Sequence, residues 1–197
     1  GRHVRIRGVA VLADVGASPD AGPVDETRRA PGEQDVVVAV PQGAQLLNVA
    51  GPLDVLDAAG RVAGGTRYRV RLATRGGQDV RTGSGLVMRA DLALEEVTGD
   101  IDLLLVPGRL PRPEETEDEE IAGMVREVVR LAPGSRRVAS VCTGAEVLAE
   151  AGLLDGRRAT THWAFGRSFR RRFPHVRWEL DRLVVRDGPV STSAGVS

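Results

Sequence analysis

Three short, mostly apolar segments constrain the fold of this chain more than any other feature. They span residues 36–40 (VVVAV), 101–106 (IDLLLV) and 137–141 (RVASV). Runs of this length are typical of strands that are buried on both faces of a sheet. Segments with helical spacing separate them, as in 121–131, where the apolar residues fall on one helix face. This alternation predicts an α/β fold with a mainly parallel sheet and helices on both faces.

Weaker signals predict the remaining elements. Pro52 suits the first turn of a helix that opens at Gly51-Pro52. Residues 68–73 alternate as a second strand, and 77–90 resemble a hairpin around a Gly-Ser-Gly turn. We expect two or three strands in 176–192, with Asp187-Gly188 as a turn.

Composition separates an N-terminal arm from one domain. Residues 13–35 are rich in Pro, Gly, Ala and acidic residues and lack helical or strand periodicity. We therefore interpret residues 1–34 as a flexible or partly ordered arm and residues 35–197 as a single domain of ordinary size.

Charge, cysteine content and hydropathy argue against a dedicated nucleic-acid binder, a disulfide scaffold and a membrane-spanning protein. The formal net charge is +0, and the one dense basic cluster (Arg167, Arg170, Arg171 and Arg172) is interpreted as a solvated helix face. The single cysteine rules out an intrachain disulfide. No apolar run approaches the ~20 residues that a membrane span needs. We expect a cytoplasmic protein that does not bind membranes and has no metal site and no cofactor.

The strand at 137–141 leads directly into Cys142, which is followed by Thr143, Gly144 and a helical segment. This order predicts a cysteine version of the nucleophile elbow. The sharp turn lifts the sulfur off the carboxyl end of the sheet, where open α/β sheets bind ligands. Gly144 keeps space for an anionic or carbonyl ligand near the helix N-terminus. The alternative is that Cys142 is a small buried hydrophobe, as lone cysteines often are.

Several segments together resemble one family. They are V-C-T-G-A at 141–145, A-G-L-L-D-G-R-R-A-T-T-H-W at 151–163, Q-L-L-N-V-A-G-P-L-D-V at 45–55 and V-P-G at 106–108. The chain resembles the ThiJ/PfpI branch of the class I glutamine amidotransferase-like superfamily over about residues 35–197. The resemblance implies a flavodoxin-like, doubly wound fold. Within the branch, the chain is most similar to the N-terminal sensing domain of AraC-type transcription regulators and to isonitrile hydratase, which hydrates an isonitrile to an N-substituted formamide.

The resemblance also implies roles for individual residues. Cys142 corresponds to the reactive cysteine, and the N–H groups of Gly108 and Thr143 correspond to oxyanion-hole donors. Asn48 falls where the family has an acidic residue beside the sulfur. His162 falls near the site, where it either pairs with the cysteine or caps and packs the helix that follows.

Two residues depart from the family pattern. Asn48 replaces Asp or Glu, and an amide cannot shuttle a proton as a carboxyl does. Arg109 replaces the second glycine of P-G-G and adds a positive charge. Arg109 either binds an anionic ligand or points to solvent, and we favour solvent.

These departures favour a small-molecule-sensing domain related to AraC-type regulators over a catalyst. The alternatives are a cysteine-dependent enzyme, either isonitrile hydratase-like or amidase/hydrolase-like, and a sensor that oxidises Cys142. We expect a small-molecule ligand and a homodimer. Relatives continue past Ser197 into a final helix, which we expect residues 35–197 to lack. We find no helix-turn-helix pattern in these residues, so we expect DNA to be bound only through a module that is absent from them.

Overall fold

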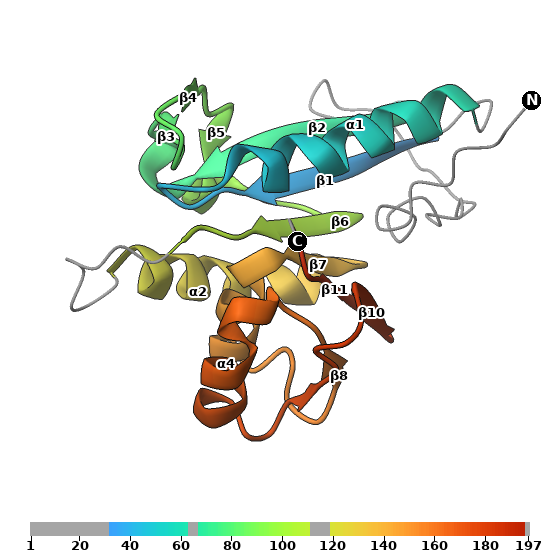
Figure 1. Ribbon diagram of the computed structural model, residues 1–197. Helices are drawn as coiled ribbons and strands as arrows, with labels where there is room; N and C mark the ends of the chain where they lie inside the picture. Colours follow the sequence, from blue (N-terminus) through green and yellow to red (C-terminus); the bar gives the residue numbers. More distant parts are fainter. Residues whose placement is uncertain (1–31, 63–66, 111–118, 196–197) are drawn as a thin grey trace, which may run out of the picture.

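A seven-stranded sheet forms the centre of the computed structural model, which describes residues 32–62, 67–110 and 119–195. The strands lie in the order β10-β11-β7-β6-β1-β2-β5 (Figure 1). Their bounds are β1 Glu33–Ala39, β2 Arg67–Thr74, β5 Leu92–Ala93, β6 Leu103–Pro107, β7 Val138–Val141, β10 Val184–Asp187 and β11 Val190–Ser193.

All neighbouring strands from β5 to β11 run parallel, and only β10 pairs with β11 in the antiparallel sense. The chain therefore moves from β1 outward to β2 and then returns to β6 on the other side of β1. This order is that of a doubly wound, flavodoxin-like sheet, and it puts the topological switch point between β1 and β6. The prediction of a mainly parallel α/β fold is confirmed.

Helices cover both faces of this sheet (Figure 1). Their bounds are α1 Leu46–Val62, α2 Glu119–Leu131, α3 Ala145–Glu150 and α4 Gly166–Arg172. Alternate residues of β1 pack on opposite faces of the sheet, since successive side chains of a strand point to opposite sides. Val36 and Val38 pack with Val49 and Leu56 of α1, whereas Val37 packs in the cluster that contains the buried residues of α2, α3 and α4.

The prediction for the start of α1 is wrong. The helix begins at Leu46 and continues through Pro52, which lies in its interior. Proline removes one backbone hydrogen bond there. Val49 and Leu56, two helical turns apart, are both buried against the sheet, and this packing holds the earlier turn in helical form. Propensity alone did not reveal that contact.

The smaller predicted elements are present. An antiparallel pair, β3 (Val80–Arg81) with β4 (Val87–Met88), forms the expected hairpin. Strands β9 (Arg177–Trp178), β10 and β11 occupy the predicted C-terminal region, and β9 pairs with β8 (Arg158–Ala159). The turn at Asp187-Gly188 joins β10 to β11 as predicted.

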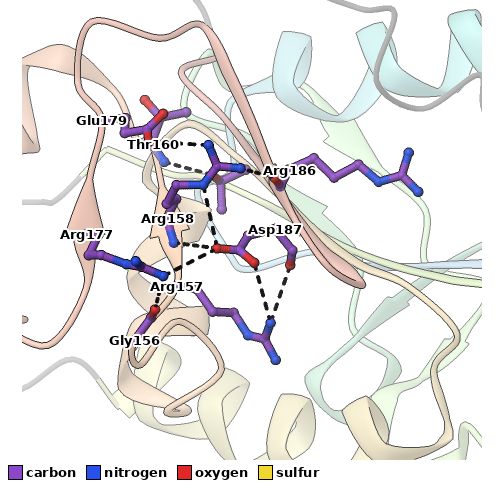
Figure 2. Close-up of polar contacts among 9 residues, drawn as sticks. Gly156, Arg157, Arg158, Thr160, Arg177, Glu179, Arg186 and Asp187 are labelled. Atoms are coloured by element: carbon purple, nitrogen blue, oxygen red, sulfur yellow. Dashed lines mark hydrogen bonds and ion pairs between the residues drawn. The ribbon is translucent and has the colours of Figure 1, made fainter.

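Asp187 ties that turn to the neighbouring β8–β9 pair. Its carboxylate accepts a hydrogen bond of 2.9 Å from the Arg158 backbone N–H. The guanidinium groups of Arg157 and Arg177 each approach it to 3.9 Å (Figure 2). The Arg158 hydrogen bond is the main influence that lowers the pKa of Asp187. The cluster therefore anchors the β10–β11 edge of the sheet.

The arginines of α4 lie on an exposed helix face, and two of them also make surface contacts. Arg172 is paired with Glu146 and Glu150 of α3, and Arg170 donates to the Trp178 carbonyl at 3.3 Å. All four arginines of the cluster are exposed, so the prediction of a solvated helix face is confirmed. Arg170 and Arg172 also fasten α4 to its neighbours through these surface contacts.

Some expectations fall outside the described residues. The proposed arm lies there except for its last residues, because β1 already begins at Glu33. Within 32–62, 67–110 and 119–195, no helix has both the length and the hydropathy that a membrane-crossing segment requires.

Candidate functional site

Cys142 lies at a sharp turn between β7 and α3. The turn is a short 3-10 helix, η4 (Cys142–Gly144). Among the described residues, Cys142 is the only non-glycine residue with a positive φ, at 61°. L-residues adopt this region at a cost, so the surrounding structure must hold the turn in place. The predicted geometry of strand, cysteine and helix is therefore present.

Two contacts from the C-terminal half hold this turn. The Thr161 hydroxyl donates to the Cys142 carbonyl at 3.0 Å. Gly195 has a φ of +78°, and a Cβ built there would lie 2.5 Å from the Cys142 Cβ. Any side chain at position 195 would therefore collide with Cys142.

The thiol is shielded from solvent and held neutral. Cys142 is 0% exposed, and this burial raises the pKa of its thiol, because water no longer solvates a thiolate. Three hydrogen-bonding groups beside the sulfur act to lower the same pKa: the Thr143 N–H, the Asn48 amide and the Thr143 hydroxyl. Burial is nevertheless the largest influence on this pKa. A reactive cysteine normally shows the opposite, a lowered pKa and partial exposure.

Two amide side chains contact the thiol, one from the residue before α1 and one from its first turn. The Cys142 thiol donates to Gln45 Oε1 at 3.7 Å. Asn48 Nδ2 donates to the same oxygen at 2.9 Å and to the Gly108 carbonyl at 3.4 Å. Asn48 is 1% exposed, and its Oδ1 has no hydrogen-bond partner. The site therefore contains one unsatisfied buried acceptor.

The turn packs closely against the segment that follows β6. A Cβ at Gly108 would lie 2.6 Å from the Thr143 nitrogen, and a Cβ at Gly144 would lie 2.1 Å from the Val106 oxygen. Both glycines are thus required by close backbone packing. This is a sufficient reason for Gly144 without any ligand. Gly108 and Thr143 thus belong to neighbouring backbone segments.

The preference for a solvent-exposed Arg109 is wrong. Arg109 is 5% exposed. Its backbone forms a bridge with Ala44, and its carbonyl accepts a 2.5 Å hydrogen bond from the Thr143 hydroxyl. These bonds hold the residue between the loop after β1 and the cysteine turn.

His162 makes a local contact. It precedes η5 (Trp163–Phe165), and its Nδ1 accepts a hydrogen bond of 3.2 Å from the Ala164 N–H. Its ring stacks on Trp163 with the centroids 5.6 Å apart. This is the capping and packing role that the sequence left open. Its neighbour Thr161, rather than His162, contacts Cys142.

The structure therefore brings together Cys142, Asn48, Gly108, Thr143, Gly144 and Arg109, with His162 one residue from a contact. It adds Gln45, Thr161 and Gly195, which the sequence analysis missed. For Gly195 the residue type itself was a signal, since glycine is favoured where backbones approach closely. No local sequence pattern identified Gln45 as a residue of the site. In the described part of the chain, no group of three His, Cys, Asp or Glu residues is arranged to hold a metal ion.

Sequence comparison places this arrangement among known proteins. Residues 34–197 match the model of the DJ-1/PfpI family. The chain is 34% identical to the isonitrile hydratase of Pseudomonas putida over 154 residues, which are 78% of this chain and 61% of that protein. It is 35% identical to the HTH-type transcriptional regulator CdhR of Pseudomonas aeruginosa over 129 residues, 65% of this chain and 36% of the regulator.

A solved structure shows the same fold. An AraC family transcriptional regulator from Pseudomonas putida superposes with a TM-score of 0.65 at 22% identity, covering 82% of this chain and 83% of that chain. The chain thus spans less than two thirds of each of the two curated relatives named above, 61% of the hydratase and 36% of the regulator.

Proposed function

Since the chain belongs to the DJ-1/PfpI family, we propose that residues 35–197 are the small-molecule-sensing domain of a transcription regulator of the AraC type. The ligand binds at the Cys142 site, which we define as Gln45, Asn48, Gly108, Thr143 and Cys142. DNA is bound by a helix-turn-helix module outside residues 1–197. Cys142 contacts the ligand and does not act as a nucleophile.

One observation carries this proposal. Asn48 is buried beside the thiol, with an unsatisfied Oδ1, in a site where burial raises the pKa of Cys142. An amide binds through hydrogen bonds but does not transfer protons. A buried acceptor without a partner costs about 1–3 kcal/mol, which a ligand that satisfies it would recover.

The position of the site supports the same conclusion. Gln45 and Asn48 follow β1, and Gly108 follows β6, so the site lies at the carboxyl ends of the two strands that flank the switch point. Open α/β sheets bind ligands at this place. The resemblance to regulators in sequence supports this assignment.

The proposal is tested by ligand-induced stabilisation. The chain and its Asn48→Leu variant are screened against small polar metabolites by thermal denaturation. A ligand at about 100 times its Kd stabilises the folded state by about 2.7 kcal/mol. We expect such a compound to stabilise the wild type and not the variant. Intact downstream coding sequence without a helix-turn-helix module would contradict the proposal.

A cysteine-dependent enzyme is the second candidate. The positive φ of Cys142 on its strand-to-helix turn and the 34% identity to an isonitrile hydratase favour it. In such an enzyme Cys142 would be the nucleophile, the N–H groups of Gly108 and Thr143 the oxyanion hole, and Asn48 or His162 the polar partner. Isonitrile or small-amide turnover that Cys142→Ala abolishes would establish this candidate and refute a purely sensing role.

The regulator assignment has two corollaries. Like its bacterial relatives, a transcription regulator would act where the chromosome lies, so we propose a cytoplasmic location. We also propose that the domain forms a homodimer. Light scattering coupled to size-exclusion chromatography checks the dimer, and a monomer at all accessible concentrations would refute it.

A further inference from the structure

Gln45 holds a central place in the Cys142 site. Its backbone N–H donates to the Gly108 carbonyl at 3.1 Å, and its carbonyl accepts from the Asn48 N–H at 3.0 Å. The backbone of Gln45 is therefore held by hydrogen bonds at both its N–H and its carbonyl group. Its side chain is half-buried, whereas Asn48 and Cys142 are both fully buried. The carboxamide of Gln45 thus lies between solvent and the two buried polar groups.

The hydrogen bonds of this carboxamide are those that a ligand would make. Its Oε1 accepts from the Cys142 thiol at 3.7 Å and from Asn48 Nδ2 at 2.9 Å. A carbonyl oxygen is the group that suits two converging donors. Asn48 Oδ1 is still without a donor. A group that combined a carbonyl with a suitably placed N–H would satisfy the Cys142 thiol and both polar atoms of the Asn48 amide.

We infer that the Gln45 carboxamide occupies the ligand's polar subsite, and that the ligand presents an uncharged carboxamide that displaces it. This inference rests on the proposed sensing function. The ligand's carbonyl takes over the hydrogen bonds from Cys142 and Asn48 Nδ2, and its N–H donates to Asn48 Oδ1. Binding therefore frees the Gln45 side chain from Cys142 and Asn48, while its backbone stays bonded to Gly108.

The chemistry of the site selects an amide over a carboxylate. The side chains that contact the sulfur are those of Gln45, Asn48 and Thr143, all uncharged. Arg109 is also buried nearby, but its contact with Thr143 is made by its backbone carbonyl. An anion placed there would be desolvated, and it would face the lone pairs of Asn48 Oδ1 instead of donating to them. An amide without an N–H would likewise leave that oxygen unsatisfied.

The test removes the internal carboxamide and supplies it from solution. Cys142 is the single cysteine of the chain, so its modification by methyl methanethiosulfonate is read directly from the intact mass. We expect Gln45→Ala to raise the rate of modification about tenfold, because the thiol loses the side chain that covers it and accepts its hydrogen bond. Acetamide replaces the missing group and slows the reaction of the variant again. Gln45→Met, which keeps the side-chain length without the amide, serves if the alanine variant does not fold.

Matched controls separate this role from a general loosening of the loop. Gln42 lies on the same loop, but its side chain bonds to the Asp79 carbonyl and the Arg81 N–H instead. We expect Gln42→Ala to react within about twofold of the wild type, since it loses no contact to Cys142. Sodium acetate and N,N-dimethylacetamide, at the concentration used for acetamide, should not protect Gln45→Ala.

The outcomes are decisive. Protection by acetamide alone supports the inference. Equal rates in the wild type and both Gln45 variants, or equal protection by acetate, would overturn it. Because no physiological ligand is used, a failed metabolite screen would count against the sensing function and leave this result standing. A negative result here would leave the sensing function intact.

Discussion

Gly144→Ala provides the most direct structural test of how the cysteine turn is built. A Cβ at position 144 would lie 2.1 Å from the Val106 oxygen and 3.1 Å from the Pro107 carbonyl carbon. These atoms belong to the backbone of β6, so no side chain can rotate away. Gly144 has φ −57° and ψ −21°, which alanine adopts readily. The cost is therefore steric and not conformational.

The magnitude follows from this overlap. Overpacking in a close-packed interior costs about 1–3 kcal/mol, and a backbone-to-backbone collision belongs at the upper end. Alanine recovers about 0.4–1 kcal/mol by restricting the unfolded chain. We expect a net loss of about 2 kcal/mol, or roughly 4–8 °C in Tm for a domain of this size.

Chemical denaturation of Gly144→Ala against Gly51→Ala measures this effect. Gly51 lies within α1, and a Cβ there meets nothing within 4 Å. Alanine at a helical position stabilises by about 0.5–1 kcal/mol relative to glycine. The two variants should therefore move in opposite directions. If Gly144→Ala were as stable as the wild type, the close packing of the turn on β6 would be refuted.

Three further predictions follow from particular contacts. Phe169→Ala empties a 2% exposed core position and should lower the free energy of unfolding by about 3–5 kcal/mol in denaturant titrations; a loss below about 1 kcal/mol would contradict the described packing. The pKa of Asp187 is lowered in the folded state, so its stabilising contribution is present above the usual carboxyl pKa and is lost as the pH falls through the folded value; the stability of Asp187→Asn should accordingly depend less on pH in that acid range, and identical profiles would refute this. His162→Ala should leave the pKa of the Cys142 thiol unchanged, because the His162 ring bonds to the Ala164 N–H; a shift in the thiol titration would indicate a direct pair.

Local sequence signals were sufficient for much of the fold. Continuous apolar runs identified β1, β6 and β7, because strands buried on both faces need no polar residues. Asp187-Gly188 identified the turn between β10 and β11, where Gly188 has a φ of +61°. The strand, cysteine and glycine order likewise identified the turn at Cys142.

The missing parts depend on contacts between distant residues. Gln45 and Cys142 are 97 positions apart, and no local pattern marks an amide as the partner of a thiol. Arg109 carries a charge, so exposure was the natural expectation. In the structure its backbone is bonded to Ala44 and Thr143, which are distant in sequence. The early start of α1 has the same origin, since Val49 is buried only because the sheet lies beneath it.

The titration of Cys142 tests the central claim that its thiol is a neutral, ligand-facing group. The rate of modification by methyl methanethiosulfonate is measured across pH in the wild-type chain and gives the pKa of this single thiol. Burial raises that pKa, so we expect a value above the ~8.5 of a free cysteine. A pKa at or below that of a free cysteine would mean that the site stabilises a thiolate, and it would contradict the assignment of Cys142 to binding.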